Sequence, residues 1–366
     1  MQINILLPYK EQFDEKKLSS VSITILNNFN HSKFKNDIKI YGKYVQSPAK
    51  PLNFIGIKNS LNFFKSKNIH IAEQMCKIIL KSKDIKQLIE IHNRPKTFHY
   101  VVNKIKSKYP INIFFHNNPL DMEGSKTKSE REFIINNAST IFCVSKFIKN
   151  QFLKGLKNRP RNINVLYNGV DRFENSFPIK KKEVLFVGRL VKEKGIELFV
   201  KSIESLASEF LDWNFCIVGS SHLGKVKEKS NFAKMISQRF LSIGSQVYFT
   251  GYLNHINVQK KMRDASIVVV PSIWEEPYGL VVSEAMSNGA AVITAFSGGI
   301  PEIIGSSGIV IKNINQKKVD SSLFLLMNDQ NTLKKFQVLS WKNFKHTAAQ
   351  SSKKLDIIRT KILFIK

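Results

Sequence analysis

The sequence predicts an α/β protein made of two Rossmann-like units, each a parallel sheet covered by helices. Short apolar runs rich in Ile, Val and Phe alternate with segments of helical periodicity from the start of the chain, which is the pattern of a parallel sheet with helices on both faces. At 366 residues the chain is too long for one ordinary hydrophobic core, so two domains are expected. Two such units joined by a linker face a shared cleft, with ligands at the carboxyl ends of the strands.

The first unit is expected to span residues 1–172. Its apolar runs predict strands at Ile3–Leu7, Ile38–Tyr41, Gln87–His92, Ile111–His116, Thr140–Val144 and Val165–Tyr167. Helical stretches fall between most of them. Residues 171–182 contain Pro178 and three consecutive lysines and interrupt the alternation, so this segment is expected to be a linker.

The second unit is expected to span residues 183–338 and opens on the strand-like VLFVGR. Apolar residues between Ile196 and Phe210 recur on one helical face, which predicts an amphipathic helix packed on the sheet. Further strands are predicted at Phe215–Val218, Val247–Thr250, Ile267–Val270, Ala291–Thr294 and Ile309–Ile311. Residues 339–366 are helix-compatible and form one or two terminal helices, with a crossing back to the first unit left open.

The chain is strongly basic, with 57 Lys and Arg against 28 Asp and Glu and a formal charge of +29. Such a balance favours anionic partners: nucleic acid, an acidic membrane face or phosphorylated substrates. No run reaches the roughly 18–20 apolar residues that cross a bilayer, and no leader pattern opens the chain, so a cytoplasmic location is expected. No helix-turn-helix, zinc-finger or RNA-binding signature is present, which disfavours nucleic acid.

Neither a disulfide framework nor a metal site is predicted. Cys76, Cys143 and Cys216 are odd in number, far apart and embedded in apolar segments, so buried free thiols are expected. The eight histidines lack metal-ligand spacing, and no Asp-x-Asp pair occurs to hold a metal against a diphosphate.

Residues 268–305 carry the most informative pattern. An apolar strand ends at Pro271, a loop follows, and a helix begins near Leu280, where free backbone N–H groups suit a phosphate or a sugar hydroxyl. Glu276 in the loop and Glu284 in the helix are separated by seven residues, so both carboxylates can accept hydrogen bonds from vicinal hydroxyls in one cleft. Acidic residues early in a helix can also merely complement its dipole, which is the preferred interpretation for the neighbouring Glu275.

A second pattern lies in residues 186–200, FVGRLVKEKGIELFV. The strand ends in Gly188, Arg189 follows at its tip, and Lys194 lies in the loop before the amphipathic helix. A guanidinium and an ammonium group at a strand end suit a diphosphate, whose charge they neutralise. For Lys192 a solvated loop position is the preferred interpretation.

These two segments resemble the retaining glycosyltransferases of family four (glycosyl transferases group 1), which have the GT-B fold. The family pattern of two glutamates with seven residues between them reads E-PYGLVVS-E here, and its Gly-Arg…Lys-Gly loop reads GRLVKEKG. The resemblance implies that Arg189 and Lys194 hold the diphosphate of a nucleotide-sugar donor. It also implies that Glu276 contacts the transferred sugar and that Glu284 binds the nucleotide ribose.

The same resemblance implies further donor contacts. The amides around Gly279, Leu280 and Val281 are expected to contact sugar or phosphate. Gly219 and the turn at Tyr252 match positions that line the nucleotide base. Arg189, Lys194 and the helix amides would then neutralise the leaving diphosphate without a metal ion, and no cofactor is expected beyond the UDP-, GDP- or ADP-sugar itself.

In the first unit, IHNRP at 91–95 and FFHNNP at 114–119 each follow a strand. Both resemble the branch of the family that builds lipopolysaccharide cores and other bacterial surface glycans. That resemblance implies that His116 faces the donor sugar near the reacting carbon, whereas His92 is expected to be structural. Many relatives carry paired glycines after the first strand, yet this chain has the glycine-free PYKEQFDEKKLSSV there, in which Lys17, Ser19 and Ser20 are candidate donors to an anionic acceptor.

The predicted function is transfer of a hexose or N-acetylhexosamine, with retention, to a lipid-linked or envelope glycan acceptor such as lipopolysaccharide core. The leaving phosphate itself would deprotonate the acceptor hydroxyl. The basic chain is expected to contact the anionic inner face of the membrane. Two alternatives stay open: a nucleotide-sugar epimerase of the same architecture and a basic nucleic-acid-binding protein. Two carboxylates can also act as a glycosidase pair, but their position beside a basic loop argues against hydrolysis.

Overall fold

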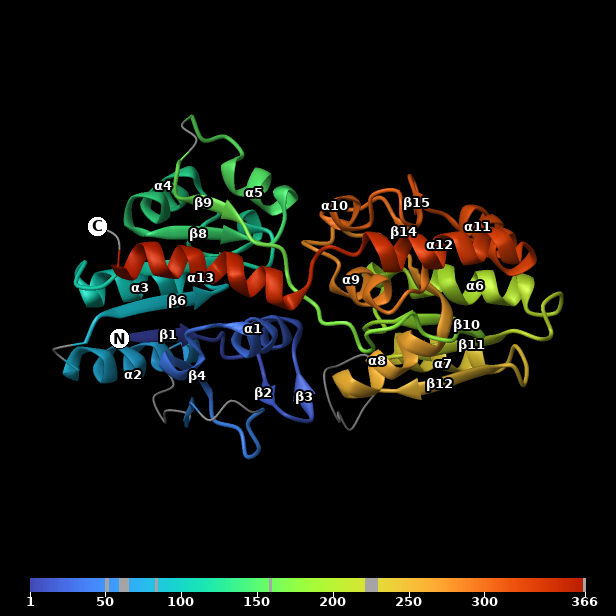
Figure 1. The fold of residues 1–366 in the computed structure, drawn as a ribbon, viewed down its shortest axis with the longest axis horizontal. Helices are drawn as coiled ribbons and strands as arrows, with labels where there is room; N and C mark the ends of the chain where they lie inside the picture. The colour runs from blue at the N-terminus through green and yellow to red at the C-terminus, as the bar shows by residue number, and fades with distance from the viewer. Residues whose placement is uncertain (50–52, 59–65, 83–84, 158–159, 221–229, 365–366) are drawn as a thin grey trace. The chain divides into compact units, whose positions relative to one another are not determined.

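The computed structural model describes residues 1–49, 53–58, 66–82, 85–157, 160–220 and 230–364. The chain divides into two compact units (Figure 1). Unit 1 comprises Met1–Gly169 with Ala348–Lys366, and unit 2 comprises Val170–Thr347. Of the terminal segment predicted at residues 339–366, the part from Ala348 onward therefore belongs to unit 1. Residues 339–347 belong to unit 2.

Unit 1 is built on a parallel sheet of seven strands in the order β5-β4-β1-β6-β7-β8-β9. The strands are β1 Gln2–Leu6, β4 Ile38–Lys43, β5 Phe54–Ile57, β6 Gln87–His92, β7 Ile111–Phe115, β8 Thr140–Cys143 and β9 Ile163–Val165. Its helices are α1 Ser20–His31, α2 Lys67–Lys81, α3 Pro95–Ile105, α4 Lys128–Asn137, α5 Lys146–Leu153 and α13 Ala348–Phe364. The central strands are fully buried, as expected for a sheet covered on both faces.

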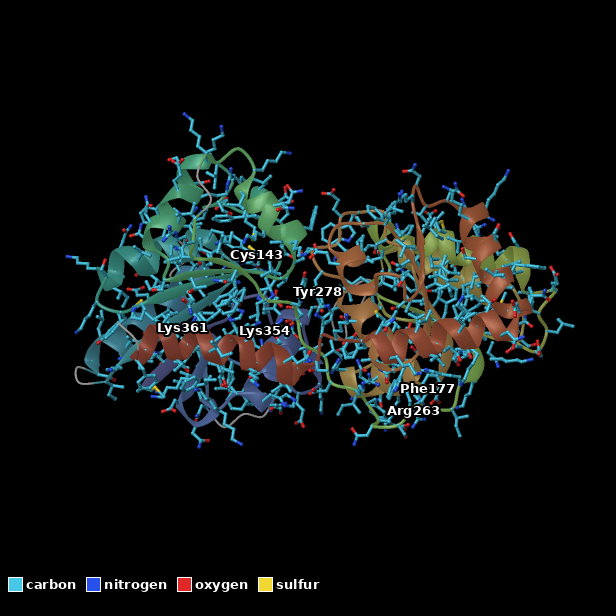
Figure 2. All side chains as sticks on the ribbon, turned by 45° about the horizontal axis from the view of Figure 1, so that its top comes forward. Cys143, Phe177, Arg263, Tyr278, Lys354 and Lys361 are labelled. Atoms are coloured by element: carbon cyan, nitrogen blue, oxygen red, sulfur yellow. The ribbon has the colours of Figure 1, made fainter. Side chains whose placement is uncertain are left out.

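The C-terminal helix α13 is fastened to unit 1 by a buried ionic network. Arg359 forms a double hydrogen bond with Glu90 on β6, at 3.0 and 2.7 Å. Its Nη1 donates to Asp356 at 3.1 Å, and Asp356 in turn accepts from Ser32 after α1 at 2.8 Å. The opposite face of α13 is exposed and carries lysines such as Lys354 (Figure 2).

The glycine-free segment after β1 folds as a small antiparallel hairpin, β2 Phe13–Asp14 with β3 Lys17–Leu18. Phe13 is buried and stacks on Phe54 of β5. Ser19 then caps α1 by accepting from the amide of Ser22, the usual solution for an unpaired first-turn N–H. The hairpin and the capped start of α1 therefore order this segment without a glycine.

Unit 2 is built on a parallel sheet of six strands in the order β12-β11-β10-β13-β14-β15. The strands are β10 Lys181–Val187, β11 Asn214–Val218, β12 Val247–Gly251, β13 Ala265–Val270, β14 Ala291–Ala295 and β15 Ile309–Ile311. The helices are α6 Ile196–Leu206, α7 Asn231–Leu241, α8 His255–Asp264, α9 Leu280–Ser287, α10 Ile300–Ile304, α11 Gln316–Asn328 and α12 Gln330–Asn343. The predicted apolar stripe of α6 is buried in the core of this unit.

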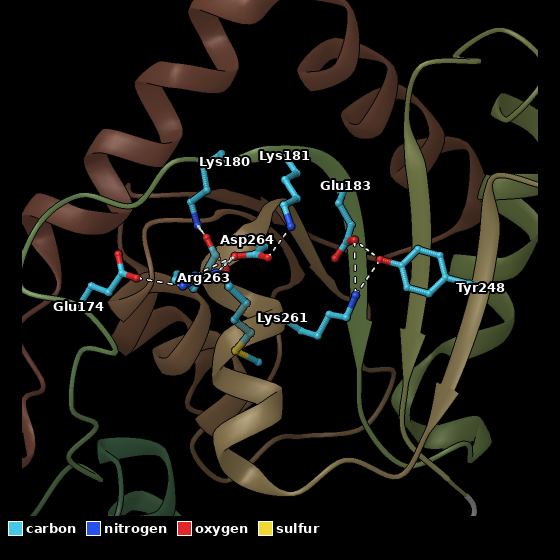
Figure 3. Close-up of polar contacts among 9 residues, drawn as sticks. Glu174, Lys180, Lys181, Glu183, Tyr248, Lys261, Arg263 and Asp264 are labelled. Carbon is cyan, nitrogen blue, oxygen red and sulfur yellow. Dashed lines mark hydrogen bonds and ion pairs between the residues drawn. The ribbon is translucent and has the colours of Figure 1, made fainter.

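The segment that leads into β10 is held to unit 2 by polar contacts (Figure 3). Lys180 donates to the carbonyls of Met262, Arg263 and Asn288 at 2.6–3.2 Å, at the ends of α8 and α9. Lys181 pairs with Asp264 at 2.8 Å and is already part of β10. The expected linker therefore ends at Lys180 instead of residue 182, because Lys181 and Lys182 are the first two residues of β10.

The predicted strands are all present, with ends shifted by a few residues at most. The pattern missed β5 and the hairpin. The two-residue strands of the hairpin are too short to show any periodicity. Within the described ranges, no helix combines the length and the apolarity needed to span a bilayer. All three cysteines are buried, Cys143 among them in unit 1 (Figure 2).

Candidate functional site

The motif residues of unit 2 lie at one edge of its sheet. Because neighbouring strands run parallel, the loops that follow them emerge at the same edge. The loops after β10 and β11 approach so closely that a Cβ on Gly219 would lie 1.8 Å from the carbonyl oxygen of Gly188. The amide of Gly219 also donates to Gly251 at 2.9 Å, which brings the turn at Tyr252 to this edge.

Lys194 and Glu276, predicted for different parts of a donor, form an ion pair. The Lys194 Nζ lies 2.5 Å from Glu276 Oε1, and Ser272 Oγ donates to the same oxygen at 2.6 Å. The loops that carry them are in direct contact, since a Cβ on Gly195 would lie 1.8 Å from the carbonyl oxygen of Pro271. Only glycine, here at a φ of +68°, permits that approach.

The backbone of Glu276 is held by the loop after β14. Its carbonyl accepts from the amide of Gly299 at 2.8 Å, and its amide donates to Ser297 Oγ at 3.4 Å. At Gly298 the φ is +51°, and an added Cβ would lie 2.1 Å from the Glu276 carbonyl oxygen. The Glu276 loop is therefore fixed by backbone contacts from two sides.

Helix α9 begins at Gly279, whose φ is +96° and which provides no side-chain cap. The first amides to bond within the helix are those of Val282 and Ser283, which donate to the Gly279 carbonyl at 3.0 and 3.2 Å. The amides of Leu280 and Val281 precede them and have no acceptor in the helix. The start of α9 therefore offers N–H donors and the positive end of the helix dipole at the same edge as Lys194.

Glu284 has a partner that the sequence did not indicate. Its Oε1 lies 2.7 Å from Nε2 of His255, the first residue of α8. Gln259 Nε2 lies 3.2 Å from the same imidazole nitrogen, and Gln259 is itself held by Asn288, whose Nδ2 donates to its Oε1 at 2.7 Å. His255 and Glu284 are 29 residues apart, so no local spacing signals the pair.

The charge on His255 depends on this contact. Burial disfavours the imidazolium, but the hydrogen bond and the negative charge of Glu284 outweigh it, so the pKa of His255 is raised above its ordinary value. Arg189, by contrast, is exposed at the tip of β10. The edge therefore presents one solvated guanidinium and two carboxylates that each contact a basic side chain.

His116, the candidate of unit 1, lies just after β7 and is buried. Its Nε2 is 2.9 Å from Nδ1 of His92 at the end of β6, and its amide donates to Asn93 Oδ1 at 2.9 Å. Phe114 stacks on the His92 ring at 4.2 Å. Burial lowers the pKa of His116 to about 4, which keeps the imidazole neutral at neutral pH.

Together, these groups define a class of site. Solvated and paired cations with free helix amides suit a polyanion such as a diphosphate, and fixed carboxylate oxygens suit hydroxyl donors.

Solved structures carry the same two-unit fold. Anabaena HepE in complex with UDP and glucose superposes with a TM-score of 0.77 at 14% identity over 98% of this chain and 99% of that one. Sucrose-phosphate synthase from Thermosynechococcus elongatus superposes at 0.75, with 15% identity over 99% of each chain. The predicted GT-B fold is confirmed.

Residues 169–338, nearly all of them in unit 2, match the family model described as glycosyl transferases group 1. An uncharacterized glycosyltransferase of Methanocaldococcus jannaschii is 31% identical over 54% of this chain and 52% of its own. Spore coat protein SA of Bacillus subtilis is 26% identical over 63% and 66%. The lipopolysaccharide 1,2-N-acetylglucosaminetransferase of Salmonella typhimurium is 26% identical over 44% and 45%. The chain thus spans about half to two thirds of these relatives.

Proposed function

We propose that the chain is a glycosyltransferase that moves a hexose or N-acetylhexosamine from a nucleoside diphosphate sugar to a glycan acceptor, with retention of configuration. The observation that carries the proposal is the Lys194–Glu276 pair beside the uncapped start of α9. A cation and helix amides can neutralise a leaving diphosphate, while the adjacent carboxylate accepts hydrogen bonds from the sugar. Cations alone would bind only the diphosphate, and carboxylates alone would bind only the sugar hydroxyls.

In this proposal each residue keeps the role that the resemblance implied. Arg189 and Lys194 bind the diphosphate, with the amides of Gly279, Leu280 and Val281. Glu276 exchanges Lys194 for the sugar hydroxyls when the phosphate arrives, so the ion pair keeps both groups oriented beforehand. Glu284 accepts from the ribose, and Gly219 and Tyr252 line the base. Neutralisation by these groups makes the transfer independent of a metal ion.

The acceptor is proposed to bind in unit 1. A cavity of about 330 Å³ lies between the β2–β3 hairpin and the segment after β4. Its lining residues are Glu11, Gln12, Asp14, Lys16, Lys17, Lys43, Tyr44, Val45, Gln46 and Ser47. Lysines in this lining fit an anionic group on the acceptor. His116 is the proposed group at the reacting carbon, and its lowered pKa keeps it a neutral hydrogen-bonding group there.

An envelope glycolipid such as lipopolysaccharide core is the proposed acceptor class. The similarity to the Salmonella lipopolysaccharide transferase and the charge of +29 support it, since each basic residue near an anionic leaflet contributes about 1 kcal/mol to membrane attraction. The enzyme would then work at the inner face of the membrane. The named relatives from Methanocaldococcus jannaschii and Salmonella typhimurium are both described as transferases, which disfavours the epimerase alternative.

Nucleotide release tests the proposal. Purified protein is incubated with UDP-, GDP- and ADP-sugars, with and without membrane extract, and with or without EDTA. Acceptor-dependent release that survives EDTA is expected. Release without acceptor would indicate a hydrolase, and conversion of the donor into another nucleotide sugar without acceptor would indicate an epimerase. Anomeric NMR of the product tests retention.

Matched variants connect the activity to the site. Glu276→Ala and Lys194→Ala should each lower turnover at least 100-fold, about 2.7 kcal/mol of transition-state stabilisation. Lys192→Ala, in the same loop but exposed, is the control and should leave turnover within about twofold. Full activity in both site variants would remove the proposed assignment.

A further inference from the structure

The strongest unassigned feature at this edge is the contact between α8 and α9. Glu284 is buried, with a side-chain exposure of 5%, and His255 is mostly buried at 26%. A buried carboxylate is costly unless it is paired. His255 is the partner that the described residues provide, and its bond of 2.7 Å is in the range of charge-assisted hydrogen bonds.

The two neighbours of the imidazole nitrogen compete for it. Glu284 Oε1 requires a proton on His255 Nε2, whereas the Gln259 amide requires a bare nitrogen there. The distances of 2.7 Å to Glu284 and 3.2 Å to Gln259 favour the protonated nitrogen. Asn288 holds the Gln259 oxygen and thereby directs its NH₂ group toward the ring. The Glu284 carboxylate therefore favours a proton on His255 Nε2, and that N–H donates to it.

We infer that His255 is a positioning residue that fixes the Glu284 carboxylate for the ribose of a nucleoside diphosphate and makes the affinity for that anionic ligand pH-dependent. The inference rests on the proposed function, which assigns the ribose to Glu284. With Oε1 occupied by His255, Glu284 Oε2 is left to accept from the ribose. The described residues show no other hydrogen bond to this carboxylate.

The pH dependence follows from the charges around the ring. Helix α8 packs against β10, β13 and α9. Strand β13 has no titratable residue, and Glu284 is the titratable residue of α9. The charged residues of β10 and of α8 itself are Lys181, Lys182, Glu183, Lys260, Lys261, Arg263 and Asp264. Glu284 is the charge that acts on His255.

The sign follows from the raised pKa. Below it, His255 is an imidazolium and the pair is neutral, so the anionic diphosphate meets no added repulsion. As pH rises through it, the imidazole still donates from Nε2, but the pair becomes negative and repels the ligand. Nucleotide affinity should therefore fall as pH rises from 6 to 9.

The test measures Kd by calorimetry for UDP and for 2′,3′-dideoxy-UDP, with GDP and ADP pairs as substitutes if wild type prefers those bases. At pH 9, where His255 is neutral and the wild-type pair has the same charge as in the variant, His255→Ala should weaken UDP on the order of tenfold, as expected for the loss of one charge-assisted hydrogen bond, and leave the dideoxy analogue unchanged. A purely structural role of His255 would weaken both ligands alike and would overturn the inference.

His255→Gln separates position from charge. Its amide can donate to Glu284 but cannot ionise, so it should restore UDP binding to within about threefold of wild type and abolish the pH dependence assigned to His255. Lys260→Ala, exposed on the same helix, is the control and should match wild type in both respects. Wild-type pH dependence in His255→Gln overturns the inference. If wild type binds none of the three nucleotides, the proposed function itself fails. This result differs from a failure of the His255 inference alone, in which wild type still binds a nucleotide.

Discussion

Replacing Arg359 by Met should unfold unit 1 much more easily while leaving unit 2 intact. Arg359 is 2% exposed and Glu90 is fully buried, so the variant leaves a carboxylate without its cation inside the sheet. It removes two hydrogen bonds to Glu90, one to Asp356 and one to Ser32. Breaking a buried pair from one side costs about 3–5 kcal/mol. With a urea m-value of about 2 kcal/mol/M, the midpoint should fall by about 1.5–2.5 M.

The tryptophans allow the two units to be followed separately. Trp213, Trp274 and Trp341 all lie between Val170 and Thr347, so tryptophan fluorescence reports unit 2 and circular dichroism reports both. The variant should show an early circular-dichroism transition with an unchanged fluorescence transition.

Two further variants test the explanation. Adding Glu90→Met to Arg359→Met replaces the pair by apolar groups and should recover most of the loss. Lys354→Met, on the exposed face of α13, should stay within about 0.5 kcal/mol of wild type. A loss below about 1 kcal/mol in Arg359→Met would refute the reasoning.

Two other predictions concern unit 2. Burial lowers the pKa of Lys180 from 10.5 to about 7, so the unfolded chain binds this proton more strongly. The free energy of unfolding of wild type, relative to that of Lys180→Met, should therefore rise above pH 7 by up to roughly 1.4 kcal/mol per pH unit. The prediction is contradicted if the difference in urea midpoint between the two proteins is the same at pH 7 and pH 9. Gly298→Ala should weaken nucleotide-sugar binding at least tenfold, because its methyl group would meet the Glu276 carbonyl. Gly155→Ala, at a φ of +76° but facing the flexible end of Lys128, should bind normally in calorimetry.

Much of the fold could be predicted because its signal is local. Buried parallel strands read as short apolar runs, and the helices between them show a different period. The hairpin at Phe13–Leu18 escaped because two-residue strands have no period, and its glycine-free sequence resembles an ordinary loop. The end of the linker was misplaced because Lys181 and Lys182 look solvated in sequence but belong to β10.

The candidate site could be predicted only in part. Lys194 and Glu276 were identified from motifs, and the parallel sheet brings them to the same edge. Their direct pairing, over 82 residues of chain, could not be derived, because each had a separate predicted partner in the donor. His255 was missed because it belongs to no motif, and a lone histidine at the start of a helix has no local feature that marks it.

From sequence alone, this protein is two α/β units with the motif residues on the loops that follow parallel strands. Side-chain pairing came from the packed chain: Lys194 with Glu276, His255 with Glu284, and Arg359 with Glu90 across 269 residues. The physical reason is range. Periodicity and turn chemistry act over a few residues, whereas an ion pair forms between whichever charged groups the packed strands and helices bring within about 4 Å.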